Sequence, residues 1–173
     1  MTSTPSETRA VAGAVLLSGA AATIAFDLFG QALSPMVGLP ALSPVPLANS
    51  VIETLAGSRW SAGAEFLHYV AGLVVYPLGW LFVAAPLSRK VAPGLPWSAA
   101  AALYGVALWA FALYGMAHLI VGMPAFLGFG AMTWVALAGH VLFALVAAGV
   151  VRRLLGVSAA PGSALGAGRP VFA

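Results

Sequence analysis

Four long, uninterrupted apolar segments dominate this sequence and restrict what it can fold into. They cover residues 10–33, 61–87, 97–121 and 126–151. Each has at least the roughly 20 residues that an α-helix needs to cross the hydrocarbon core of a membrane. Because the apolar residues are continuous rather than alternating, the segments do not resemble the strands of a transmembrane β-barrel. The pattern predicts an all-α integral membrane protein, folded as an antiparallel four-helix transmembrane bundle.

The composition supports lipid as the main partner of the chain. Hydrophobic residues make up 62% of the sequence and charged residues only 6%, whereas a soluble domain has about 25% charged residues. The net charge is +3, but the basic residues are scattered and form no patch that would bind nucleic acid. Cysteine is absent, which excludes disulfides, thiolate metal sites and cysteine nucleophiles. Other membrane subunits, or a second copy of the chain, remain open as protein partners.

The positions of the basic residues predict the orientation in a bacterial inner membrane. Six of the seven cations fall on one side of the four segments: Arg9, Arg89, Lys90, Arg152, Arg153 and Arg169. Only Arg59 falls on the other side. Because cytoplasmic loops are enriched in Lys and Arg, we expect both termini to be cytoplasmic. This gives an N-terminal tail over residues 1–9, a transmembrane domain over 10–153 and a C-terminal tail over 154–173.

The first outer loop is long enough to contain a short helix of its own, over residues 46–56. Pro46 suits the first turn of a helix, and Gly57 suits a C-terminal cap. Leu47, Val51 and Leu55 then lie on one face. This amphipathic pattern predicts an interfacial helix on the outer surface of the bilayer or of the bundle.

Five ionisable residues inside the predicted spans are the candidate functional residues: Asp27, Glu65, His68, His118 and His140. Such residues are costly in lipid and mark ligand sites, proton pathways or structural pairs. At about 1.5 Å per residue, the first four fall in the outer third of the membrane, and His140 lies nearer the midplane. We therefore expect these residues to form a polar seam that opens to the outside and that binds a ligand or carries protons. Within it, we expect Asp27 and His68 to be in contact. The alternative is that these groups only bond to one another and stabilise the bundle.

Helical spacing predicts which faces point inward. In the third segment the predicted inward residues are Tyr104, Ala107, Phe111, Tyr114 and His118. In the fourth they are Thr133, Ala136, His140, Ala144 and Ala148. Small residues on such faces allow helices to approach closely, and polar ones bond across the contact.

The candidate residues are also of the types that bind metal ions or haem. Imidazole and carboxylate groups bind transition metals, and the candidate ligands are His68, His118 and Asp27. Haem b requires two histidines at matching depth, yet His68 differs in depth from His118 by about 6 Å and from His140 by about 10 Å on ideal helices. Haem b and a transition metal therefore stay open as cofactors, and neither is favoured. No catalytic triad or nucleotide-binding motif is present, so no catalytic residue is assigned.

Three short motifs carry a family resemblance. They are the carboxylate of Asp27, the run Phe-Leu-His-Tyr-Val-Ala-Gly over residues 66–72, and the run Ala-Gly-His-Val-Leu-Phe over residues 138–143. With them, residues 10–153 resemble the YagU-like and related domain-of-unknown-function families of small four-helix bacterial inner-membrane proteins. The resemblance implies a fold and a location, and it implies no activity.

The sequence as a whole favours a non-enzymatic multi-pass membrane protein, either an accessory subunit or a small-ligand-binding bundle. Two alternatives follow from the same residues. One is a redox protein that binds haem or a metal, and the other is a proton or small-solute conductor formed by a homo-oligomer.

Overall fold

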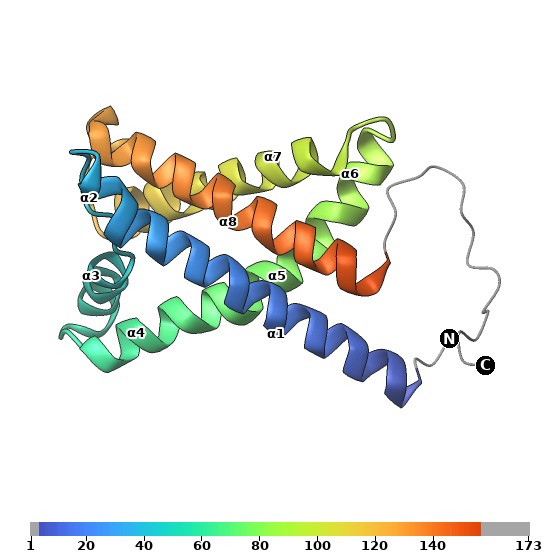
Figure 1. Cartoon of the computed structure of the whole chain (residues 1–173). Helices are drawn as coiled ribbons and strands as arrows, with labels where there is room; N and C mark the ends of the chain where they lie inside the picture. The colour runs from blue at the N-terminus through green and yellow to red at the C-terminus, as the bar shows by residue number, and fades with distance from the viewer. Residues whose placement is uncertain (1–3, 157–173) are drawn as a thin grey trace, which may run out of the picture.

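The computed structural model describes residues 4–156 and is an all-α bundle (Figure 1). In this part of the chain, four helical spans are long and apolar enough to cross a membrane: Pro5–Met36, Ser61–Val91, Trp97–Ile120 and Ala131–Leu155. A short helix, α3 (Val45–Ala56), connects the first two spans and ends at Gly57, whose positive φ of 79° caps it. The predicted short helix and its glycine cap are thus confirmed. The chain is a multi-pass α-helical membrane protein by the length and composition of its spans.

Each span except the last combines α-helical and wider, π-helical turns. The first consists of α1 (Pro5–Leu28), η1 (Phe29–Leu33) and α2 (Ser34–Met36). The second consists of α4 (Ser61–Val70), η2 (Ala71–Val75), α5 (Tyr76–Gly79), η3 (Trp80–Ala84) and α6 (Ala85–Val91). The third consists of α7 (Trp97–Ala110) and η4 (Phe111–Ile120), and the fourth is α8 (Ala131–Leu155).

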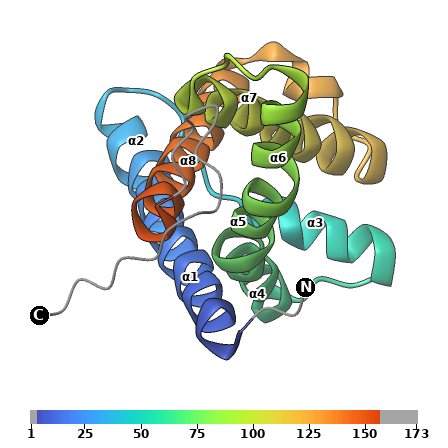
Figure 2. The same cartoon turned by 90° about the vertical axis from the view of Figure 1, so that its right-hand side faces the viewer.

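The bundle has two chemically different ends (Figures 1 and 2). The start of α1, the α6–α7 connection and the end of α8 lie together, and we call this the basic end. Its cations include Arg89 and Lys90 in the last turn of α6, and Arg152 and Arg153 in the last turn of α8. The opposite end carries α2, α3 and the start of α4, and we call it the α3 end. The predicted tail beyond α8, with Arg169, lies outside the described residues.

The first span begins earlier than the hydropathy pattern predicts, at Pro5 rather than residue 10. Thr4 and Glu7 form a reciprocal capping box there: the Glu7 carboxylate accepts from the Thr4 amide at 2.8 Å, and the Thr4 hydroxyl accepts from the Glu7 amide at 3.3 Å. Such a box satisfies amides that the first helical turn leaves without partners. Polar residues therefore extend the helix beyond its apolar part.

The fourth span begins later than predicted, at Ala131 rather than residue 126. Residues Ala125–Phe129 (η5) form a tight turn instead, in which Phe126, Leu127 and Phe129 have positive φ angles of 50°, 51° and 56°. The Phe126 ring stacks on Trp109 with 4.7 Å between centroids. These residues are apolar because they pack in an aromatic cluster, and their hydropathy therefore does not indicate a helix.

The inward face predicted for the fourth span is confirmed, and the one predicted for the third is only partly correct. Tyr104 points inward and its hydroxyl donates to the Tyr76 carbonyl at 2.8 Å, but three other residues of that face do not. Thr133, Ala136, His140, Ala144 and Ala148 are all buried. In the third span Ala107, Phe111 and Tyr114 are exposed. The buried residues there are Ala101, Gly105, Leu108, Leu113 and Ala117. Their spacing widens from Leu108 to Leu113, where the chain enters the π-helical η4, because a wider turn shifts the inward face by one residue.

α8 packs against both α1 and α7, and a glycine of α7 allows its close approach to α8. A Cβ atom added at Gly105 of α7 would lie 2.6 Å from the Val141 Cα atom and 2.7 Å from the His140 carbonyl oxygen. Both are backbone atoms of α8, so they cannot move aside as a flexible side chain would. Gly105 is therefore required for the α7–α8 contact.

We expect Gly105→Ala to lower the free energy of unfolding by about 1–3 kcal/mol, since overpacking forces the two helices apart. Gly13→Ala is the matched control, because no atom lies within 4 Å of the added Cβ there. Unfolding of both variants in mixed detergent micelles would measure the difference. Equal stability of the two variants would show that the α7–α8 contact is not limited by Gly105.

Candidate ligand-binding site

A cavity of about 490 Å³ lies between the four spans in the half of the bundle near the α3 end. Its wall is mainly apolar and contains aromatic rings from different elements: Phe26 of α1, Tyr76 of α5, Phe111 of η4 and Phe143 of α8. Cavities that bind small molecules commonly have a volume of about 300–1,000 Å³ and mostly apolar walls with a few polar groups. The size and lining therefore suit a small, largely apolar ligand.

Helix α3 covers the cavity at the α3 end of the bundle. It contacts both α4 and η4, and it contributes Leu47 and Val51 to the cavity wall. Leu55, predicted to share their face, is exposed. The short helix thus packs on the bundle between the second and third spans, where it closes one side of the cavity.

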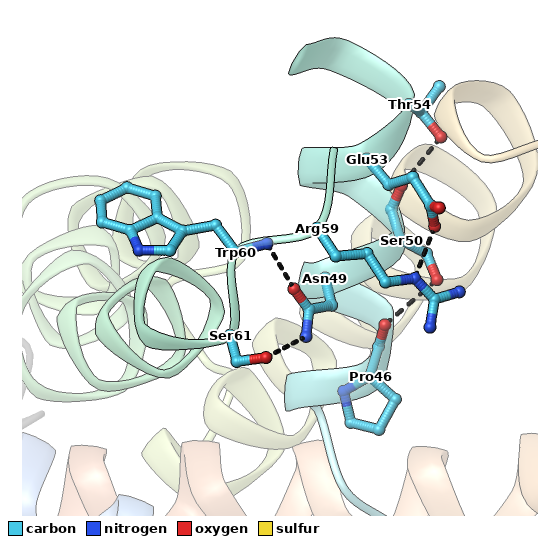
Figure 3. Close-up of polar contacts among 8 residues, drawn as sticks. All are labelled: Pro46, Asn49, Ser50, Glu53, Thr54, Arg59, Trp60 and Ser61. Atoms are coloured by element: carbon cyan, nitrogen blue, oxygen red, sulfur yellow. Dashed lines mark hydrogen bonds and ion pairs between the residues drawn. The ribbon is translucent and has the colours of Figure 1, made fainter. Parts of the chain in front are cut away.

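Polar contacts hold α3 to the start of α4 (Figure 3). The Asn49 side-chain oxygen accepts from the Trp60 amide at 3.1 Å, and its nitrogen donates to the Ser61 hydroxyl at 3.4 Å. Next to it, Arg59 forms an ion pair with Glu53 at 2.8 Å. The ion pair is exposed and contributes little stability. Asn49 matters more, because it joins the cover to the helix that carries His68.

His68 of α4 lies on the cavity wall and bonds to Asp27 of α1. Its Nε2 atom is 3.2 Å from Asp27 Oδ1 and 3.3 Å from Oδ2, which confirms the predicted contact. Gln31, one turn further along, donates to Asp27 Oδ1 at 3.1 Å. A carboxylate only accepts, so Nε2 carries the hydrogen. This leaves Nδ1 of the neutral ring as an acceptor.

His140 of α8 lies on the same cavity wall, with only 9% of its surface exposed. Its Nδ1 atom is 2.7 Å from the Ala136 carbonyl oxygen, so Nδ1 donates the hydrogen and Nε2 of the neutral ring is an acceptor. The ring meets Phe26 edge-on, with 5.2 Å between centroids. No hydrogen bond of Nε2 occurs among residues 4–156.

His68 and His140 lie at similar depths in the bundle, and the predicted 10 Å difference is too large. They contact Asp27 and Phe26, which are consecutive residues of α1. The prediction was wrong because α8 starts at Ala131 and not at residue 126. His140 is nine residues into α8 and His68 seven residues into α4, which gives a difference of about 3 Å.

Two of the predicted site residues lie away from the cavity. Glu65 is exposed on α4. His118 is partly buried, and its Nδ1 lies 2.8 Å from the Met123 carbonyl oxygen. Neither lines the cavity. Within residues 4–156 no three His, Asp or Glu side chains come together to hold a metal ion, so the candidate ligands His68, His118 and Asp27 do not converge.

Thr23 of α1 is a buried polar group on the cavity wall. Its hydroxyl has no hydrogen-bond partner in the described part of the chain. The hydroxyl instead occupies the space that a Cβ atom at Gly72 would fill. Glycine at this position therefore lets α1 approach η2 closely, next to the cavity.

Comparisons of the chain with protein-family models, with curated proteins and with solved structures find no match.

The contact between Asp27 and His68 predicts non-additive effects on stability. Each single change, Asp27→Asn or His68→Gln, removes one partner and leaves the other in a partly buried position. We expect the double variant to lose less stability than the sum of the single variants, with a coupling energy of about 0.5–3 kcal/mol. Unfolding of the four proteins in mixed micelles would measure it.

The same measurements with a chelator added identify the kind of contact. A direct pair gives the same coupling with and without chelator, which is our expectation from the 3.2 Å separation. A coupling that disappears with chelator would indicate a shared metal ion. Strictly additive losses would contradict an interaction between the two side chains.

Proposed function

We propose that this protein is a binding protein of the bacterial inner membrane, without enzymatic activity of its own, that holds a small, mainly apolar molecule between its spans. The observation that carries this proposal is the cavity of about 490 Å³, bounded by all four spans and by α3. The cavity is apolar enough to take a molecule from lipid, and its two histidines supply polar groups that orient a ligand.

The wall of the cavity supports access from the lipid side. Leu67 and Val75 of the second span and Phe111 of the third all line the cavity, and each is about half exposed on the outside of the bundle. These residues belong to the two spans between which α3 packs. A ligand dissolved in the bilayer therefore reaches the cavity sideways, without crossing the polar headgroup region.

We place the basic end of the bundle in the cytoplasm. Arg9, Arg89, Lys90, Arg152 and Arg153 support this orientation, because cations of short loops are retained on the cytoplasmic side. Both ends of the described chain are then cytoplasmic, and the cavity lies in the outer half of the membrane.

The absence of cysteine makes the orientation simple to test. Ala92→Cys in the α6–α7 connection and Ser58→Cys after α3 are both at exposed positions. In intact spheroplasts, we expect a membrane-impermeant maleimide to label Ser58→Cys and to label Ala92→Cys only after lysis. The reverse pattern would contradict the proposed orientation.

A haem protein is the second candidate function, because His68 and His140 both line the cavity and contact consecutive residues of α1. Each ring N–H is held by a carboxylate or a carbonyl, as is common for histidines that coordinate metals. Against it, the bond of His68 Nε2 to Asp27 leaves only Nδ1 of that ring to coordinate iron. A Soret band in the purified protein that is absent from His140→Phe would favour haem over the apolar ligand.

Filling the cavity tests the main proposal. Ala71→Phe adds a ring at a partly buried position on the cavity wall, and Ala138→Phe is a matched change at an exposed position of α8 outside the cavity. We use 4-hexylanisole as an apolar probe and lipid nanodiscs as the membrane. We expect a saturable rise in Tm for the wild type and Ala138→Phe, because a ligand that binds the folded state stabilises it.

Ala71→Phe should show no such rise. A rise of the same size in all three proteins would show that the probe acts through the lipid. The absence of a saturable rise in the wild type would contradict the proposed apolar site.

A further inference from the structure

We propose that the ligand of this cavity is a lipophilic phenol or hydroquinone, whose hydroxyl group donates a hydrogen bond to Nε2 of His140. This inference rests on the proposed function, since it names the ligand class of the same cavity. Four properties of the wall support it: the acceptors present, the charges absent, the aromatic rings and the exposed apolar side chains.

The first property is that His140, whose ring is buried on the cavity wall, offers an acceptor without a hydrogen-bond partner in the described part of the chain. Its Nδ1 atom lies 2.7 Å from the Ala136 carbonyl oxygen and donates to it, so the ring hydrogen is on Nδ1. This leaves Nε2 with a free lone pair on a ring that is nine-tenths buried. A buried acceptor that loses water and gains no donor destabilises the occupied site. A ligand that fills this cavity therefore binds best when it carries an O–H or N–H donor.

His68 provides a second acceptor on another wall of the cavity. Its Nε2 atom lies 3.2 Å from Asp27 Oδ1 and donates to that carboxylate, so Nδ1 is the atom of this ring that accepts when it carries no hydrogen. Because both histidines lie at similar depths in the bundle, a ring with two hydroxyl groups has an acceptor on α8 and another on α4. This is why hydroquinones belong to the proposed class together with simple phenols.

The second property is the absence of charge on the described cavity wall. Its lining contains no Lys, Arg, Asp or Glu. A carboxylate or phosphate group would thus be buried without a cation, and an amine without a carboxylate, at a high cost in free energy. A neutral hydroxyl avoids that cost. The ligand therefore differs from phospholipids and fatty acids, which also reside in the bilayer.

The last two properties select an aromatic, lipophilic molecule. The rings of Phe26, Tyr76, Phe111 and Phe143 lie on the wall, and aromatic pairs contribute about 0.5–1.5 kcal/mol beyond the burial of their area. An aromatic hydroxyl also donates a stronger hydrogen bond than an aliphatic one, because it is more acidic. The exposed apolar side chains of Leu67, Val75 and Phe111 on the cavity wall suit an alkyl substituent that extends into lipid.

A ligand pair that differs only in the donor tests the proposal. We use 4-hexylphenol and 4-hexylanisole, in which a methyl group replaces the hydroxyl hydrogen, and measure Tm against ligand concentration in nanodiscs. We expect the phenol to bind the wild type about fivefold to tenfold more tightly, which matches one net hydrogen bond. Concentrations are compared after correction for partition of each compound into empty nanodiscs.

The variant His140→Phe should abolish this preference while it keeps a ring at the same position. The two probes should then bind with equal affinity, close to that of the anisole for the wild type. The preference of the wild type for 4-hexylphenol over 4-hexylanisole tests the hydroxyl donor by itself, so the proposal is tested even if His140→Phe does not fold. In that event His140→Leu replaces it.

Each outcome has a distinct meaning. Equal affinities of phenol and anisole for the wild type would overturn the hydroxyl donor and leave the apolar site intact. A preference that persists in His140→Phe would overturn His140 as its acceptor. Equal binding of 4-hexylphenol and 4-hexylcyclohexanol would overturn the aromatic class. If none of the probes binds saturably, the proposed function itself fails.

Discussion

The close contact of α8 with its two neighbours is the constraint on which the rest of the structure depends. The buried face of α8 consists largely of small residues, among them Ala136, Gly139, Ala144 and Ala148. In lipid there is no hydrophobic force between helices, so such contacts hold a bundle together by close packing. Because α1 and α7 both pack on α8, the second span and α3 are left to surround the remaining space. The cavity lies there, beside the close contacts rather than within them.

The sequence predicted the architecture well because the relevant signals are physically strong. Four apolar runs specify four spans, and a proline and a glycine delimit α3. The buried face of α8 follows α-helical spacing from Thr133 to Ala148, since that span has no π-helical turn in the described structure. The pairing of Asp27 with His68 followed from the cost of leaving either group alone in lipid.

The parts of the site that the sequence did not predict depend on backbone geometry. Hydropathy cannot distinguish the helix that starts at Ala131 from the aromatic turn before it, and the resulting error of five residues separated His140 from His68. Spacing rules also assume a uniform helix, so they failed in η4, where Tyr114 points outward and Leu113 inward. The role of α3 as a cover depends on the hydrogen bonds of Asn49 with Trp60 and Ser61, which have no distinctive sequence pattern.

The π-helical turns also determine which kinds of sequence change the bundle tolerates. In η2, the amide of Tyr76 donates to the carbonyl of Ala71, so this turn contains one more residue than an α-helical turn. Deletion of a single residue there would restore a regular α-helical turn and leave the two flanking parts of the span in nearly the same relative orientation, because the wider turn contains just this one extra residue. His68 would then still face Asp27. The π-helical turns are thus the places where the spans tolerate a change of length, and homologues with this site can have one residue fewer in η2.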